Sequence, residues 1–187
     1  MMKNIKINKI AATALVMLSL MGCTKDVDFN QLDDANIYTT YVSTLIYLNL
    51  TAPDFLNDFN QEIKVTSDFI EPPITDETKP YLEKVEFTVI TKNTFNRNFK
   101  LSITFYDVFG APIYVLQPII NVPENSSELI TMIEIPKADI HFIYNTRYFG
   151  FTVLLSPSTD GSVISISDTS KFDLKSSAKL FFNYRKI

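Results

Sequence analysis

The stretch FKLSITF at residues 99–105 decides the fold class, because its side chains alternate strictly in character. Phe99, Leu101, Ile103 and Phe105 fall on one parity, and a lysine, a serine and a threonine fall on the other. Successive side chains of a strand point to opposite faces, so the alternation predicts a strand that buries one face. The stretch at 85–89 repeats the pattern, and we expect the two strands to pair as a hairpin across an asparagine-rich connection.

The same alternation continues in both directions along the chain. It predicts further strands at 38–51, 112–117, 128–135, 148–155 and 178–185, with a tight turn at 107–110 and one short helical segment at 136–140. Roughly seven to nine short strands without long helices indicate an all-β, antiparallel two-sheet sandwich of the immunoglobulin-like or fibronectin-like kind. A closed β-barrel is the alternative fold.

Composition excludes several kinds of chemistry. The chain has 187 residues, of which 46% are hydrophobic and 20% are charged, as is typical of a globular domain. It has one Cys, one His, no Trp and four Gly. These are too few ligands for a zinc or iron–sulfur site and too few glycines for a phosphate-binding loop, so we expect no metal and no cofactor.

The first 23 residues have the pattern of a secretion signal. Three lysines within residues 1–9 precede a mostly apolar run at 10–20. The junction Leu20-Met21-Gly22-Cys23 resembles the lipobox of bacterial lipoproteins, in which the cysteine is lipidated and becomes the new N-terminus. The resemblance implies a cleaved signal peptide at 1–22 and a lipid anchor on Cys23, which would hold the domain at a membrane.

We therefore expect three parts: the signal peptide, a flexible acidic tether at 23–36, and a β-sandwich domain at 37–187. Asp26 and Asp28, together with the lipobox and the strand pattern, resemble the small β-sandwich lipoproteins of the Bacteroidota. That resemblance implies a cell-envelope location, anchored to the outer membrane on either its periplasmic or its surface-exposed face. It assigns no activity.

Charge excludes nucleic acid as a partner. Residues 1–22 hold three of the 17 basic residues and none of the 21 acidic ones, so the mature chain has 14 basic residues and a formal net charge of −7. Nucleic-acid binding requires a basic surface.

Catalytic residues are not evident from the sequence. His141 is the single histidine, and no nucleophile elbow accompanies it. The acidic pairs Asp33-Asp34 and Asp76-Glu77, and Glu71, lie in polar stretches, whereas a glycosidase needs one carboxyl in an apolar pocket. We expect no catalytic residues and no enzymatic activity.

The candidate interaction surface consists of apolar side chains on the parity that faces solvent. These are Tyr41, Tyr47, Tyr114, Ile130, Met132 and Tyr148. Faces rich in tyrosine and partly apolar suit protein interfaces. We therefore predict a non-catalytic accessory or adaptor subunit that docks to another outer-membrane or surface protein. The alternative is a lipoprotein that binds a glycan or small ligand through exposed tyrosines.

Overall fold

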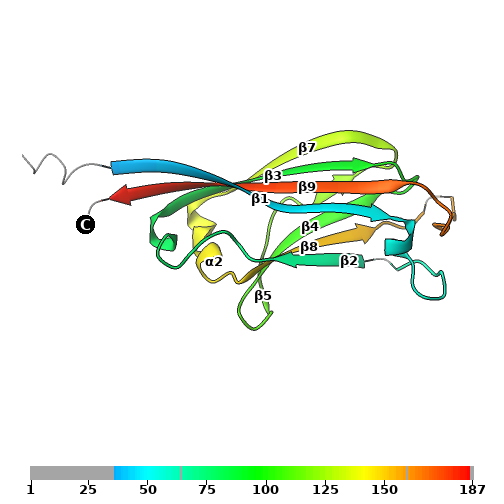
Figure 1. Cartoon of the computed structure of the whole chain (residues 1–187), viewed down its shortest axis with the longest axis horizontal. Helices are drawn as coiled ribbons and strands as arrows, with labels where there is room; N and C mark the ends of the chain where they lie inside the picture. The colour runs from blue at the N-terminus through cyan, green and yellow to red at the C-terminus, as the bar shows by residue number, and fades with distance from the viewer. Residues whose placement is uncertain (1–35, 64, 159, 186–187) are drawn as a thin grey trace, which may run out of the picture. The chain divides into compact units, whose positions relative to one another are not determined.

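The computed structural model describes residues 36–63, 65–158 and 160–185, and Asn36–Arg185 form one compact unit. The predicted signal peptide, the lipobox with Cys23 and nearly all of the tether lie outside the described residues. Within the described part, nine strands form two antiparallel sheets that pack face to face (Figure 1). The all-β, two-sheet prediction is confirmed, and the sheets do not close into a barrel.

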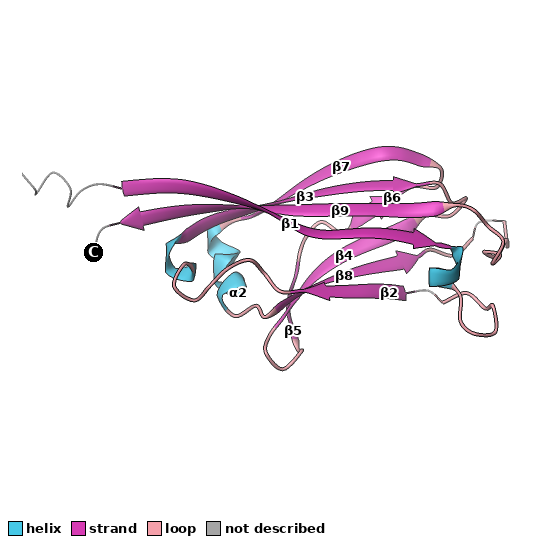
Figure 2. Cartoon of the chain, viewed as in Figure 1, coloured by secondary structure: helices cyan, strands magenta, loops and turns pink. Residues whose placement is uncertain are grey.

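Each sheet combines strands from distant parts of the chain (Figure 2). The four-stranded sheet has the order β1 (Asn36–Thr51), β9 (Lys171–Arg185), β3 (Leu82–Asn93) and β7 (Ser126–Ile135). The five-stranded sheet has the order β2 (Val65–Ile70), β8 (Tyr148–Leu155), β4 (Phe99–Tyr106) and β5 (Pro112–Val115), and β6 (Ile120–Val122) also pairs with β4.

The strand order is that of a jelly roll. The first strand lies beside the last, as the blue and red ribbons of Figure 1 show, and β5 and β6 together make one interrupted edge strand. Two sheets of four with this order form the double Greek key of jelly-roll domains. This order differs from that of an immunoglobulin-like sandwich. The sequence did not predict a strand order, because alternation specifies which side of a strand is buried but not which strands become neighbours.

The predicted hairpin between the strands at 85–89 and 99–105 is wrong. The first lies in β3, which pairs with β7 and β9, and the second lies in β4, which pairs with β5, β6 and β8. The two strands face each other across the core, and the connection between them crosses from sheet to sheet. Strands that pair edge to edge and strands that pack face to face have the same alternating sequence.

Phenylalanine dominates the core between the sheets. Eight phenylalanines are fully buried: Phe55, Phe87, Phe95, Phe99, Phe105, Phe149, Phe151 and Phe172. Several meet in edge-to-face or tilted pairs, such as Phe87 with Phe149 at 5.5 Å and Phe99 with Phe172 at 4.8 Å between ring centres. Such pairs add to the stabilisation that burial itself provides.

A bulge in β1 changes which side chains face outward. Thr44 pairs with Ser177 and Ile46 pairs with Ser176, so Leu45 is the extra residue. The sequence analysis gave Tyr41 and Tyr47 the same parity, but the bulge puts them on opposite faces of the sheet. The prediction that both share one face is therefore wrong.

Short helical segments and turns join the strands. They are η2 (Ala52–Phe55), η3 (Lys79–Tyr81), η4 (Lys137–Asp139) and α2 (Ile140–Tyr144). The last two form the helical segment predicted after Pro136. The predicted tight turn is also present: the Gly110 amide donates to the Asp107 carbonyl at 3.1 Å, and Gly110 has a φ of 77°.

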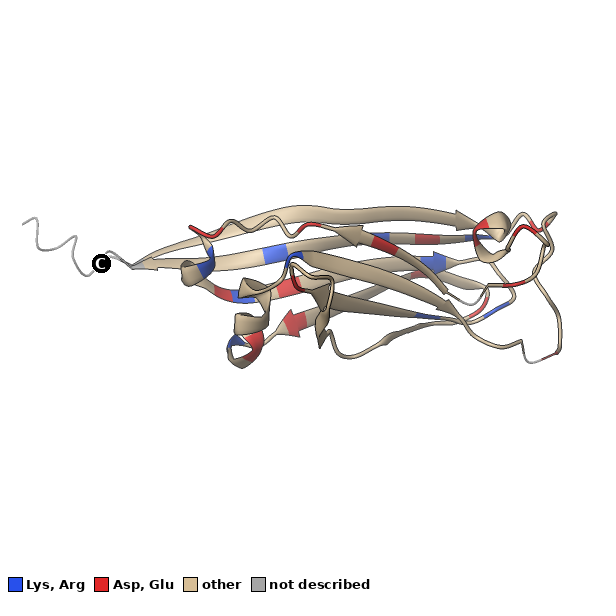
Figure 3. Ribbon diagram, turned by 90° about the horizontal axis from the view of Figure 1, so that it is seen from below, with Lys and Arg blue, Asp and Glu red and all other residues tan. Residues whose placement is uncertain are grey.

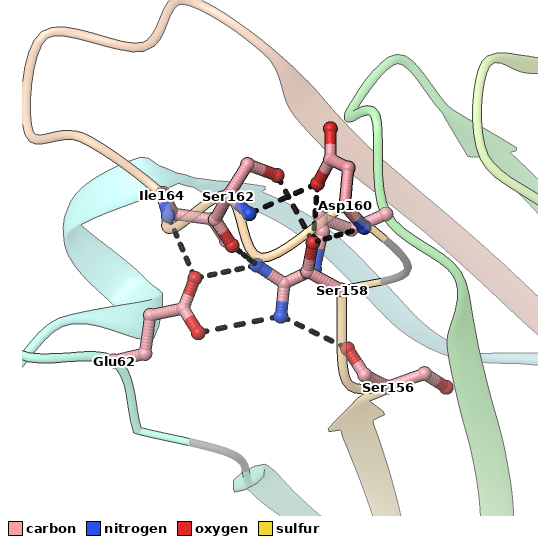
Figure 4. Close-up of polar contacts among 7 residues, drawn as sticks. Glu62, Ser156, Ser158, Asp160, Ser162 and Ile164 are labelled. Atoms are coloured by element: carbon pink, nitrogen blue, oxygen red, sulfur yellow. Dashed lines mark hydrogen bonds and ion pairs between the residues drawn. The ribbon is translucent and has the colours of Figure 1, made fainter.

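A buried arginine ties three connections together at one end of the sandwich (Figure 4). Arg97 is 6% exposed, and its Nη1 and Nη2 donate to the Glu62 carboxylate at 2.6 and 3.3 Å. The same two nitrogens donate to the carbonyls of Ser162 and Ser156, each at 3.0 Å. Glu62 also accepts from the Ile164 amide at 2.6 Å. We call Arg97 and Glu62 the buried clasp.

Candidate functional site

Three of the predicted interaction residues lie on the outer face of the four-stranded sheet. Tyr47 belongs to β1, and Ile130 and Met132 belong to β7. Their exposed fractions are 61%, 64% and 73%. Large apolar side chains gathered on one exposed face indicate a contact surface.

The strand register places Tyr47 and Ile130 in one row across the sheet. Tyr47 pairs with Lys175 of β9, and Lys175 pairs with Ile90 of β3. Ile90 in turn pairs with Ile130, and Met132 follows two positions further along β7. The Lys175 ammonium lies 5.6 Å from the centre of the Tyr47 ring. We call Tyr47, Ile90, Ile130 and Met132 the apolar belt.

Charged side chains border the apolar belt on one side. Lys84 Nζ lies 2.7 Å from Glu86 Oε1 and 3.0 Å from Glu134 Oε2. These hydrogen bonds, first that to Glu86, raise the pKa of Lys84 above its ordinary value. Glu86 also pairs across the strands with Lys179. This border combines both signs of charge, and positive and negative positions are mixed along the described ribbon in Figure 3.

A second border follows on the other side of the belt. Here a hollow of about 220 Å³ is lined by Tyr47, Ile90, Thr91, Lys92, Glu128, Asp173 and Lys175. The belt is thus largely apolar, with Lys175 between Tyr47 and Ile90, and charged borders lie on both sides of it. Protein interfaces have this anatomy, with an apolar centre and a polar rim.

The belt also reaches an open edge. β7 is the last strand of its sheet, and Ile130 and Met132 project from it. An edge strand presents backbone N–H and C=O groups that an added strand can bind. A partner that covers the belt could therefore also pair with β7.

The other predicted interaction residues lie elsewhere. Tyr41 is on the opposite side of β1, where it lines a hollow of about 330 Å³ with Pro73, Phe182, Tyr184 and other residues. Tyr148 belongs to the five-stranded sheet. The structure therefore brings together three of the six residues, and leaves the other three at separate places.

Tyr114 is half-buried and packs into the fold. Its ring stacks on Phe142 with 4.8 Å between ring centres, and its hydroxyl donates to Asp139 Oδ2 at 3.2 Å. Burial, followed by the hydrogen bond to Asp139, raises the pKa of Tyr114. These contacts assign Tyr114 a role in packing.

The candidate catalytic groups do not form a catalytic arrangement: Glu71, Asp76 and Glu77 line one hollow, and His141 is not among its lining residues. His141 is exposed on α2, with Nδ1 2.8 Å from the Ala138 carbonyl oxygen. Asp76 pairs with Lys79 at 2.7 Å, which lowers the pKa of that carboxyl. A hydrogen bond with Thr75 lowers the pKa of Glu77. A general acid requires a shift in the opposite direction.

A hollow at the end of the five-stranded sheet near the 107–110 turn has a mixed lining. It measures about 840 Å³ and includes Glu71, Asp76, Glu77, Lys79, Asp107, Phe109 and Arg147. The Asp107 carboxylate is engaged by the Phe109 and Ala111 amides of its own turn, at 2.8 and 2.9 Å. Arg147 pairs with Glu71 at 3.0 Å. Its charged groups are largely engaged with one another.

The sequence analysis missed Ile90, the buried clasp and the whole of β2. Ile90 follows the alternation of residues 85–89 on its outward parity, so that pattern contained the signal. In β2, three consecutive polar residues at 66–68 separate Val65 from Phe69, so no alternation indicated the strand. The clasp has no local signature, since Arg97 and Glu62 meet only through folding.

Among the described residues, no helix is long and apolar enough to cross a bilayer. Nor does any group of three His, Cys, Asp or Glu side chains in that part of the chain lie together in a way suited to a metal ion.

No protein-family model matches the chain. No curated protein matches it either. Among solved structures, similarity extends to a secreted protein of Parabacteroides distasonis, with 15% identity, a TM-score of 0.49, and coverage of 62% of this chain and 37% of that one.

Two further similar structures come from a virus particle and from a xylan-binding domain. The VP2 subviral particle of infectious bursal disease virus is 8% identical with a TM-score of 0.41, covering 78% of this chain and 33% of that one. The xylan-binding CBM22-1 domain of Paenibacillus barcinonensis Xyn10C is 9% identical with a TM-score of 0.29, covering 56% and 58%. The chain thus spans about a third of the length of the secreted and viral proteins. With every TM-score below 0.5, none of these likenesses carries a functional inference.

Proposed function

We propose that this chain is a non-catalytic envelope lipoprotein, anchored to the outer membrane through Cys23, that docks to another envelope protein as an accessory or adaptor subunit. The observation that carries the proposal is the apolar belt: Tyr47, Ile130 and Met132 are each more than half exposed on one sheet face. Charged borders on both sides of the belt complete the pattern of an interface.

The state of the candidate catalytic groups supports a binding role. Salt bridges and turn hydrogen bonds engage Asp76, Glu71 and Asp107 in the hollow of about 840 Å³. The pKa values of Asp76 and Glu77 are lowered, which keeps these carboxyls ionised rather than available as acids at neutral pH. A hydrolase would need the reverse at one of them.

The proposed partner is a protein with an apolar strip of its own. Its strip would cover the belt, and its rim charges would meet the mixed lysines and glutamates at the borders. An extended segment of the partner would pair with the free edge of β7.

The test uses the full-length lipoprotein in its own membranes. A photo-crosslinking residue at position 132 should capture one envelope protein in stoichiometric amounts, and the same residue at Val163, which is 74% exposed in a loop, should not. The double variant Ile130→Glu, Met132→Glu should lose the partner, while Val163→Glu keeps it. Equal capture at both positions would contradict the docking role of the belt.

The anchor is tested separately. Cys23→Ala should leave the chain unlipidated and release it from the membrane fraction, because the acyl chains supply the membrane affinity. Retention of the Cys23→Ala chain in the membrane fraction, with unchanged mass, would contradict the anchor.

A further inference from the structure

The outer face of the five-stranded sheet has a different character from the belt. Tyr148 of β8 pairs with Tyr106 of β4, and in the next row Phe69 of β2 pairs with Gly150 of β8. The Phe69 and Tyr106 rings meet edge to face, with centres 5.4 Å apart, and Phe69 is 53% exposed. We call Phe69, Tyr106 and Tyr148 the aromatic cradle.

Gly150 makes the cradle possible. A Cβ at this position would lie 2.6 Å from Tyr106 Cε2 and 2.9 Å from Phe69 Cε1, which is closer than side-chain carbons approach one another. Without a side chain, the two rings lean over the strand from either side. They border a hollow of about 240 Å³, together with Tyr148 and Gly110.

A strip of hydroxyl groups continues from the cradle along the same face. Ser67, Thr152 and Ser102 form one row across β2, β8 and β4. The hydroxyls of Ser67 and Thr152 lie 3.1 Å apart. At about 3.4 Å per residue, the four residues from Tyr148 to Thr152 place the hydroxyl row about 14 Å along the strand from the row of Tyr148.

Formal charge is nearly absent from this face. Outward-facing residues pair across β2, β8 and β4. Among them, Lys100 is the single charged residue, and it lies in the row beyond the hydroxyl strip. The corresponding face of the other sheet has Lys84, Glu86, Lys175 and Lys179 in its paired rows. At the edge of this face, Arg147 is a second cation: its guanidinium carbon lies 5.7 Å from the centre of the Tyr148 ring, and Glu71 pairs with it at 3.0 Å.

We propose that the aromatic cradle and the hydroxyl strip bind a neutral oligosaccharide. The C–H face of a sugar ring packs on aromatic rings, and sugar hydroxyls exchange hydrogen bonds with serine and threonine. Apolar rings with a few converging polar groups are the usual construction of a ligand site. The site lies on a different sheet from the apolar belt, so the chain would bind a saccharide in addition to the proposed protein partner.

The experiment measures retardation of the purified full-length lipoprotein in native gels. The gels contain soluble neutral polysaccharides (a β-glucan, a xylan, a mannan and an α-glucan) or, as the charged control, polygalacturonate. We expect at least one neutral polysaccharide to retard the protein and polygalacturonate to leave it unaffected. Titration calorimetry with the matching neutral hexasaccharide then gives the affinity.

Single variants locate the site. Phe69→Ala and Tyr148→Ala should each weaken binding by about tenfold or more, since each removes a stacking surface. Phe59→Ala removes a ring that is 82% exposed in the connection between β1 and β2, and should leave the affinity unchanged. Ser67→Lys replaces one hydroxyl of the strip with an ammonium group and keeps all three rings, and it should also weaken binding. This variant still tests the site if a ring variant fails to fold.

Three results would overturn the proposal. The first is no retardation by any of the neutral polysaccharides. The second is retention of full affinity by both Phe69→Ala and Tyr148→Ala. The third is binding of a proline-rich decapeptide at the cradle without binding of any saccharide, since polyproline segments also dock on aromatic surfaces. None of these results depends on whether the apolar belt docks a protein.

Discussion

The two outer faces of the sandwich are made from strands with the same alternating pattern, yet they present different chemistry. The four-stranded sheet exposes the apolar belt between borders of lysine and glutamate. The five-stranded sheet presents the exposed ring of Phe69, the half-buried rings of Tyr106 and Tyr148, and a strip of hydroxyls. Burial of the shared core requires only that inward positions be apolar, so the outward positions are free to differ and can serve different partners.

One substitution should disable both faces together, because the buried clasp supports the connections between the sheets. Arg97→Ala removes the guanidinium that binds the Glu62 carboxylate and leaves the Ser156 and Ser162 carbonyls short of a donor. Breaking a buried ion pair in this way costs about 3–5 kcal/mol. We expect the urea midpoint of unfolding to fall accordingly.

The matched control for the clasp is Arg147→Ala. Arg147 and Glu71 form an exposed pair, with side chains 51% and 59% exposed, and such pairs contribute about 0–1 kcal/mol. Equal losses of stability in the two variants would mean that the clasp does not hold the connections.

A second substitution should affect the aromatic face alone. Gly150→Val forces the Phe69 and Tyr106 rings apart, at a cost of about 1–3 kcal/mol, and closes the hollow. We expect saccharide binding to disappear while cross-linking at position 132 persists. Gly161→Ala is the comparison, because its φ of 78° makes alanine costly although no atom lies within 4 Å. If Gly161→Ala also abolished binding, the effect would come from lost stability.

Tyr114 lies at a sequence position that alternation predicted to face solvent. Its substitution tests whether the side chain belongs to a binding surface or to the packed interior. Tyr114→Phe removes the hydrogen bond to Asp139 and should cost about 0.5–1.5 kcal/mol without altering either binding activity. Its raised pKa also predicts a pH dependence, since a group with a folded pKa above its unfolded value of 10.0 stabilises the fold below that pH. Above about pH 10, unfolding free energy should fall more steeply in the wild type than in Tyr114→Phe. Parallel curves would exclude this assignment.

The smallest change in stability is expected at the apolar belt. Ile130→Glu with Met132→Glu alters side chains that are 64% and 73% exposed, so the free energy of unfolding should change by about 0.5 kcal/mol or less. Partner capture should nevertheless be lost. A large drop in the urea midpoint would indicate that these side chains act in packing, and would weaken the contrast between the two faces.

Local patterns predicted much of this fold, and long-range pairing accounts for what they missed. The alternation at 99–105 identified β4, and the Asp and Gly of residues 107–110 identified the turn that follows it. The β3–β4 hairpin failed because alternation does not distinguish strands in one sheet from strands in opposite sheets. The bulge at Leu45 reverses which side chains of β1 face outward on one side of the bulge. One extra residue makes this change, and the local sequence does not indicate it.

The candidate site was predictable to a similar extent. Ile130 and Met132 were found because they interrupt the polar parity of their strand, and Tyr47 because it follows the alternation after the bulge. The aromatic cradle was not found, because it requires three strands and a glycine whose neighbours are set by the jelly-roll order. Sequence periodicity assigns side chains to faces, and strand order decides which of them meet.

The pairing of β1 with β9 also has a consequence for how the chain folds. β9 lies between β1 and β3, so the four-stranded sheet has no completed centre until residues 171–185 are available. Contacts between such distant segments have a high contact order, which slows folding and leaves strand edges open in the meantime. A chain truncated before Lys171 should therefore be unable to assemble this sheet. In the 187-residue chain, the sheet should form only when β9 inserts between β1 and β3.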